Sequence, residues 1–68
     1  MLKTFDGRAW VIFYLLDHGH VAKVSELMRV LKAPLERVER LVDIMLSRGE
    51  LRIFVRRGRR ATVVELNH

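Results

Sequence analysis

The stretch PLERVERLVDIMLSRGELRIFVRRGRR, residues 34–60, has the pattern of an amphipathic helix followed directly by a β-hairpin. Its first half repeats apolar side chains at helical spacing, at Leu35, Val38, Leu41, Val42 and Met45. At about 100° per residue, the last three fall within about 60° of Val38, which gives the helix one apolar face. Pro34 suits the first turn, where its missing N–H is not needed, and Gly49 suits the position after a helix. We therefore predict a helix over residues 34–48.

The second half of this stretch has the composition of two β-strands. Residues 51–56 and 60–66 are rich in Val, Ile, Phe and Thr, and they flank the tripeptide 57–59, Arg-Gly-Arg. Because glycine readily adopts a positive φ, this tripeptide predicts the turn of a β-hairpin. Turns of two and of three residues are both compatible with it. The strand register, and with it the face of the sheet that carries Phe54, stays open.

Another helix is predicted before residues 34–48, over about residues 25–31. Ser25 can act as its N-cap, and Glu26 lies in the first turn, where the helix dipole favours a negative charge. Its apolar residues repeat at helical spacing at Leu27, Val30 and Leu31, with Met28 beside them. Lys32 and Ala33 form the turn that follows. Residues 21–24 are expected to be a short extended link.

The amino-terminal segment predicts one more helix, over about residues 6–18, which comes first along the chain. Thr4 or Asp6 can cap it, and Gly19 suits its carboxyl-terminal end. Residues 9–16 are apolar on every side, and such a helix must be covered on more than one face. In so short a chain a second copy can supply part of that cover. We therefore expect a homodimer whose interface contains Trp10, Phe13 and Tyr14.

Three helices followed by a hairpin resemble the winged helix-turn-helix family of DNA-binding domains, as in many small bacterial and archaeal repressors. The resemblance covers nearly the whole chain, and its matching stretches are residues 24–27 (VSEL), 38–42 (VERLV) and 46–51 (LSRGEL). It implies a single domain, residues 1–68, with an α+β fold in which a two-stranded β-hairpin wing follows three helices. The family often has Ser or Thr before the recognition helix, where this chain has Ala33 and Pro34, and the turn lacks the usual Gly.

The resemblance implies that the recognition helix is residues 34–48 and that it enters the DNA major groove. The outward side chains near its start would then contact DNA, namely Glu36, Arg37, Glu39 and Arg40. Arginine can pair with guanine or phosphate, and glutamate can accept a hydrogen bond from a cytosine amine. The alternative is an ion pair between Glu36 and Arg40 on a solvated face. A symmetric dimer would read a pseudo-palindrome with half-sites about one helical turn apart.

The hairpin turn carries the most specific signal in the chain. Arg56, Arg57, Arg59 and Arg60 surround Gly58, so a tight turn brings four guanidinium groups together. Like charges at this distance repel one another, and an anionic partner would relieve that repulsion. Arginine suits phosphate oxygens and a narrow minor groove. The alternative is that the arginines keep an exposed hairpin soluble and discourage edge pairing, but four charges of one sign exceed that need.

Charge is distributed unevenly along the chain. Thirteen Lys and Arg face eight Asp and Glu, which gives a net charge of +5 and a pI near 10.8. Residues 1–50 hold eight basic and seven acidic side chains, whereas residues 51–68 hold five and one. This local excess favours a polyanionic partner. The sequence predicts a transcriptional regulator that binds double-stranded DNA sequence-specifically. The alternatives are a winged-helix protein-interaction module, favoured by the acidic residues of the last helix, and a non-specific nucleic-acid-binding protein.

Other functions are disfavoured by what the sequence lacks. There is no cysteine for thiol chemistry or a Cys-based zinc site, and His18 and His20 alone are too few to predict a metal site. No nucleophile–base set or phosphate-binding loop is recognisable, so we expect neither catalysis nor a cofactor. The longest apolar run, residues 9–16, is far below the roughly twenty residues that span a bilayer, so we expect a cytoplasmic protein without membrane contact. The absence of glutamine is typical of thermophiles.

Overall fold

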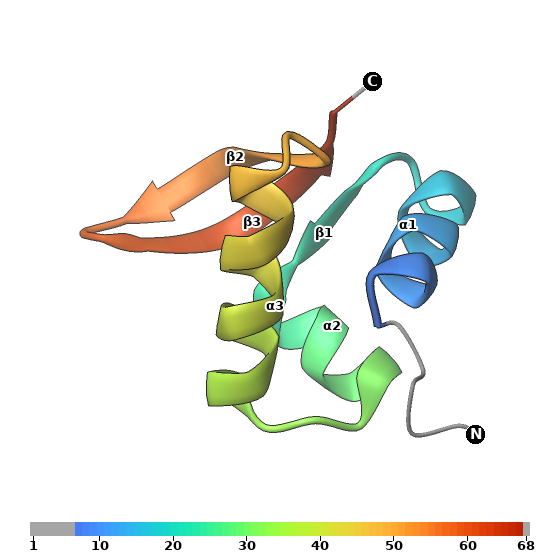
Figure 1. Ribbon diagram of the computed structural model, residues 1–68, viewed down its shortest axis with the longest axis horizontal. Helices are drawn as coiled ribbons and strands as arrows, with labels where there is room; N and C mark the ends of the chain where they lie inside the picture. The colour runs from blue at the N-terminus through green and yellow to red at the C-terminus, as the bar shows by residue number, and fades with distance from the viewer. Residues whose placement is uncertain (1–6, 68) are drawn as a thin grey trace.

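The computed structural model describes residues 7–67, and in this range three helices and three strands form an α+β fold. The elements follow one another along the chain as α1 (Gly7–Asp17), β1 (Val21–Lys23), α2 (Val24–Leu31), α3 (Leu35–Ser47), β2 (Leu51–Arg57) and β3 (Arg60–Leu66) (Figure 1). The three predicted helices and both hairpin strands are present, with ends within a residue or two of the prediction. The predicted caps of the first helix, Thr4 and Asp6, lie outside the described residues.

The sheet has three antiparallel strands in the order β1-β3-β2, not the two that the sequence predicts. The segment expected to be an extended link pairs with β3 instead, with Val21 opposite Glu65 and Lys23 opposite Val63. Because this partner lies about forty residues further along the chain, no local pattern could have identified a strand of three residues. β3 is therefore the central strand, with a neighbour on each side.

Pairing of β1 also changes where α2 begins. Lys23 stays extended, at φ −78° and ψ 147°, and takes the N-cap position, so the helix begins at Val24, two residues earlier than an N-cap at Ser25 predicts. Ser25 is consequently an exposed residue of the first turn rather than the N-cap. Glu26 lies in the first turn as predicted, and its Oε1 accepts a hydrogen bond from the backbone N–H of Lys23 at 3.3 Å. Pro34, predicted in the first turn of α3, instead precedes the helix as its N-cap residue with an extended backbone.

Eleven apolar residues from all six elements form one core beneath the sheet, and among the described residues no polar side chain is buried. The apolar face predicted for α3 is confirmed, since Val38, Val42 and Met45 are buried there. The other buried residues are Val11, Leu15, Ala22, Val24, Leu27, Leu51, Val64 and Leu66. α1 therefore contributes only one of its faces, through Val11 and Leu15.

The β2–β3 hairpin turns on two residues, since Arg57 pairs with Arg60 and Gly58 has a φ of +63°. Its register shifts twice. Phe54 has no partner on β3, and Thr62 has none on β2. Such bulges increase the local twist of a strand pair, and here the second shift restores the register that the first one changes. Phe54, whose face was undetermined from the sequence, is 58% exposed.

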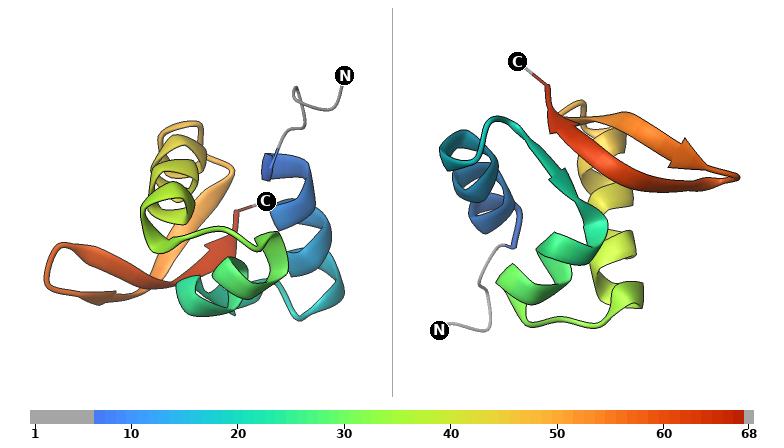
Figure 2. Two further views of the ribbon diagram at one scale, coloured as in Figure 1. Left: turned by 90° about the horizontal axis from the view of Figure 1, so that it is seen from below. Right: turned by 180° about the vertical axis from the view of Figure 1, so that it is seen from behind.

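The molecule is elongated, with extents of 36 × 24 × 21 Å. The hairpin extends past α3 at one end, α1 forms the opposite end, and α2 and α3 lie between them (Figures 1 and 2). Within residues 7–67, no helix combines the length and the apolar character that crossing a lipid bilayer requires.

Candidate nucleic-acid interface

The end of the hairpin carries the four predicted arginines on a two-residue turn. Arg56 and Arg57 end β2, Arg60 begins β3, and Arg59 lies in the turn beside Gly58. All five residues are exposed. The pairing of Arg57 with Arg60 places two of these cationic side chains directly opposite each other, an arrangement that destabilises a strand pair. The tip is therefore a surface of concentrated positive charge that projects from the body of the molecule (Figure 1).

The hairpin lies against the outward flank of α3. Arg60 Nε is 3.7 Å from Glu39 Oε2, and the two side chains are 66% and 34% exposed. A small cavity of about 120 Å³ beside this ion pair is lined by Asp43 of α3 and by Arg59 of the hairpin, among others. The two surfaces that the sequence assigns to DNA, the hairpin tip and the start of the last helix, are therefore neighbours in space.

Three arginines on the body of the molecule, Arg8, Arg48 and Arg52, have carboxylate partners. Arg52 Nη2 lies 3.2 Å from Glu65 Oε1, and both Arg8 and Arg48 approach Glu50 Oε2, at 3.7 and 3.5 Å. Among the described residues, by contrast, no carboxylate forms an ion pair with the tip residues Arg56, Arg57 and Arg59. Arg37 and Arg40 of α3 also form no ion pair in the described range, but at the tip three unpaired arginines lie within four residues of chain, so positive charge is densest there.

The outward face of α3 has mixed charge. Glu36, Arg40 and Asp43 are exposed on it, and the alternative ion pair between Glu36 and Arg40 is not formed in the described part of the chain. Asp43 is a carboxylate that the site predicted from the sequence does not include. With Glu39 and Arg37 included, the helix shows three carboxylates and two guanidinium groups, so its own surface does not attract a polyanion.

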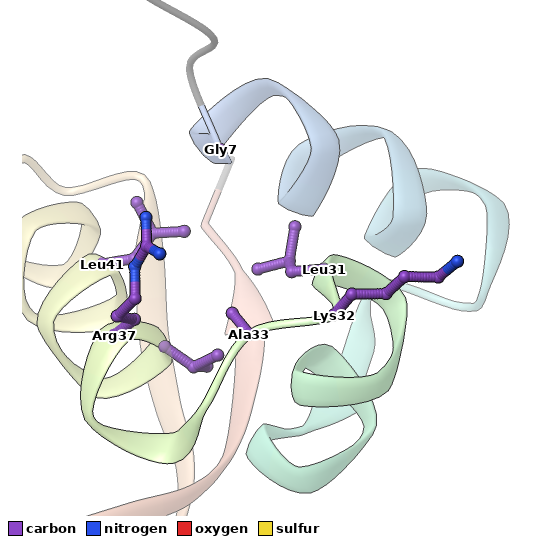
Figure 3. A pocket seen from close by; sticks show the side chains of 7 residues that line it. Gly7, Leu31, Lys32, Ala33, Arg37 and Leu41 are labelled. Atoms are coloured by element: carbon purple, nitrogen blue, oxygen red, sulfur yellow. The ribbon is translucent and has the colours of Figure 1, made fainter. Parts of the chain in front are cut away.

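Arg37 lies on the other flank of α3 from Glu39, because two residues turn a helix by about 200°. Its guanidinium group lies beside Leu41 at a cavity of about 270 Å³ between α1, α3 and the turn that precedes α3 (Figure 3). The cavity is lined by Gly7, Leu31, Lys32, Ala33, Arg37, Val38 and Leu41. Of the four predicted contacts on α3, Arg37 is therefore the one that faces away from the hairpin.

Two further polar residues join this surface. Lys23 and Ser25 are exposed at the start of α2, and they share a groove of about 410 Å³ with Arg60. The apolar lining of the groove comes from α2, α3 and β3, through Val24, Met28, Leu35 and Val63. Sequence reasoning missed Lys23 and Ser25 because only the pairing of β1 with β3 brings them beside the hairpin.

The three residues predicted for a dimer interface have different surroundings. Trp10 and Phe13 are 51% and 64% exposed. Tyr14 is half-buried, its ring stacks on His18 with 3.9 Å between the centroids, and its hydroxyl donates a hydrogen bond to Glu26. That bond is the main reason why the pKa of Glu26 is lowered and the pKa of Tyr14 is raised. Tyr14 thus joins α1 to α2.

His18 takes part in this same contact, since its Nδ1 lies 2.8 Å from the carbonyl oxygen of Tyr14. No three metal-ligating side chains gather anywhere in the described range 7–67.

Comparison with protein-family models, with curated proteins and with solved structures finds no match to this chain. Inference about its function therefore rests on the arrangement of its own residues.

Proposed function

We propose that this chain is a winged helix-turn-helix domain that binds double-stranded DNA sequence-specifically and acts as a transcriptional regulator. The observation that carries the proposal is the tip of the hairpin, where Arg56, Arg57 and Arg59 have no carboxylate partner among the described residues. Lysine or arginine side chains that neutralise phosphates release condensed counterions, and this release drives association with DNA. The hairpin serves as the wing of the domain.

In this proposal α3 supplies sequence preference. A helix fits the width of the major groove, and Glu36 and Arg40 lie at the centre of its outward face. Arg40 would donate to guanine and Glu36 would accept from a cytosine amine. The tip arginines would hold the adjacent backbone or minor groove, since the Arg60–Glu39 contact keeps hairpin and helix on one side of the molecule.

The carboxylates of α3 should lower the affinity for DNA in general and so increase the selectivity among sequences. Glu39 neutralises part of the charge of Arg60, and Asp43 lies at the cavity beside Arg59. Both reduce the attraction to phosphates in any sequence, so binding that does not use base contacts should be weak. DNA sequences that offer hydrogen-bond partners to Glu36 and Arg40 should therefore be bound more tightly than other sequences.

The proposal is tested with the full chain in a gel-shift assay with a random-sequence duplex at two salt concentrations, followed by selection of the bound fraction. We expect a dissociation constant of about 10⁻⁴–10⁻⁶ M for the random duplex at physiological salt, and much tighter binding at low salt. We also expect repeated selection to enrich a common sequence. No binding at low salt would contradict the proposal. Binding without enrichment would favour a non-specific nucleic-acid-binding protein.

A second candidate function is a winged-helix module that binds another protein. It is favoured by the three carboxylates on α3, Glu36, Glu39 and Asp43, which a polyanion would not attract. In this case the partner protein would offer acidic groups to the hairpin arginines and basic groups to the carboxylates of α3. The two candidates are separated by the same low-salt assay, since this one predicts that duplex DNA is not retained.

A further inference from the structure

Helix α1 has a second apolar face that the core does not use. Phe13 and Leu16 are 64% and 54% exposed, and Trp10 at the edge of the same stripe is 51% exposed. At about 100° per residue, Phe13 lies about 160° from both Val11 and Leu15, the two residues that α1 buries in the core. The stripe therefore points away from the molecule, at the end opposite to the hairpin (Figure 1).

The charges at the two ends of this stripe have opposite signs. Asp17 is the last residue of α1, and its side chain is 85% exposed. The carboxyl-terminal end of a helix is its negative pole, so Asp17 is unfavourably placed on its own helix. Near the other end, Trp10 borders a cavity of about 210 Å³ whose only charged lining residue is Lys32.

An anion at one end of an apolar stripe and a cation near the other make the surface complementary to itself after a rotation of 180°. Two copies of α1 that pack antiparallel place Asp17 of each copy beside the positive end of the other helix and close to the other Lys32. A parallel pair would instead bring the two Asp17 side chains together. Charge thus selects both the partner and its direction.

We propose that the partner of this face is a second copy of the chain, with α1 antiparallel to α1 and Phe13 on the two-fold axis. In this arrangement Trp10 packs against the partner's Leu16, and Ala9 lies opposite the partner's Asp17. Tyr14 takes no part, because its hydroxyl is bound to Glu26. Both hairpins stay free at the far ends of the dimer, and the inference does not depend on the proposed function.

The interface is small, because α1 has 11 residues and shows three large apolar side chains. Weak interfaces bury less than about 1,200 Å² in total, and we expect a dissociation constant of the order of 1 µM. Sedimentation equilibrium at about 100 µM chain should then show a dimer for the natural sequence. A monomer at this concentration would overturn the proposal.

Phe13→Glu tests the position of the axis, because it places two carboxylates against each other in the dimer. Phe54→Glu is its matched control, since Phe54 is the same residue type at a similar exposure, 58%, on β2. We expect the Phe13 variant to be monomeric and the Phe54 variant to remain dimeric, both with unchanged helical circular dichroism. A dimeric Phe13 variant, or two variants that behave alike, would contradict the proposal.

Cross-linking tests the direction and does not need a disruptive charge. The natural chain has no cysteine, so Ala9→Cys and Asp17→Cys each carry a single thiol. With a short bis-maleimide, we expect a mixture of the two variants to give a cross-linked dimer that contains one chain of each. Dimers of each variant with itself would indicate a parallel pair. That result, or no cross-link at all, would overturn the proposed arrangement.

Discussion

The two ends of this molecule are exposed in different ways. At the hairpin end, four arginines are gathered around Gly58, and the charged residues that could neutralise them lie back on α3. At the α1 end, the exposed stripe is apolar, and charge is limited to its borders, at Asp17 and Lys32. Uncompensated charge suits a polyanion, which it attracts over about a Debye length of 10 Å. An exposed apolar stripe suits a close, dry contact. The molecule therefore presents two exposed surfaces of different chemistry, one cationic and one apolar.

The largest expected effect comes from truncating a residue of the core that supports both ends of the molecule. Leu15 of α1 is fully buried in the core, whereas its neighbour Leu16 is 54% exposed. We expect Leu15→Ala to lower the free energy of unfolding by about 2–5 kcal/mol, because a cavity remains in the core. Leu16→Ala should lower it by about 0.5 kcal/mol or less. Urea unfolding at a chain concentration too low for self-association measures both. Equal losses would contradict the assignment of the two faces of α1.

This contrast on α1 also shows which features of the structure can be predicted from the sequence alone. The apolar face of α3 and the positive φ at Gly58 were predictable, because each depends on residues within a few positions. On α1 every position is apolar, so no periodicity distinguishes the buried Leu15 from the exposed Leu16. Only packing against α2 and the sheet makes that distinction. It also shows that Tyr14 joins α1 to α2.

Contacts between distant segments were not predictable for the same reason. β1 becomes a strand because β3 pairs with it, and Lys23 and Ser25 join the candidate interface only through that pairing. The Glu39–Arg60 ion pair requires the hairpin to lie along α3, and the bulge at Phe54 requires a particular register. The residues of the hairpin tip could be chosen from the sequence because a tight turn is a local structure. Their proximity to α3 could not.

Removing the carboxylate that neutralises Arg60 should increase the net positive charge at the hairpin end. Glu39→Gln should raise the affinity for duplex DNA about two- to five-fold, in line with the energy of an exposed ion pair, and should steepen the salt dependence by about one unit. Asp17→Asn is the control, because it removes the same charge at the opposite end of the molecule, where Asp17 forms no ion pair with the hairpin in the described range. It should change affinity less and leave the salt dependence unchanged. Equal effects on the salt dependence would show that the Glu39–Arg60 pair does not limit binding.

The smallest expected effect concerns the junction of α1 with α2. The hydrogen bond from Tyr14 lowers the pKa of Glu26 from its ordinary value of 4.5 and raises that of Tyr14 from 10.0. A lowered carboxylate pKa stabilises the fold above the ordinary value, and this stabilisation is lost as pH falls through the lowered pKa. A raised phenol pKa stabilises below the ordinary value and is lost as pH rises through the raised one. Urea midpoints should therefore be higher for the natural chain than for Tyr14→Phe at neutral pH, and the two should converge in strong acid. A difference independent of pH would contradict the role of this bond.

The central claim, that the hairpin tip contacts phosphates, is tested most directly by the salt dependence of DNA binding. Replacing both Arg57 and Arg59 with Ala should weaken binding to every duplex and reduce the slope of log K against log salt by about two units. Replacing both Arg48 and Arg52 with Ala removes the same charge from arginines that are already paired with Glu50 and Glu65. We expect an unchanged slope for this second variant. Equal slopes for the natural chain and the Arg57/Arg59 variant would contradict the contact between tip and phosphates.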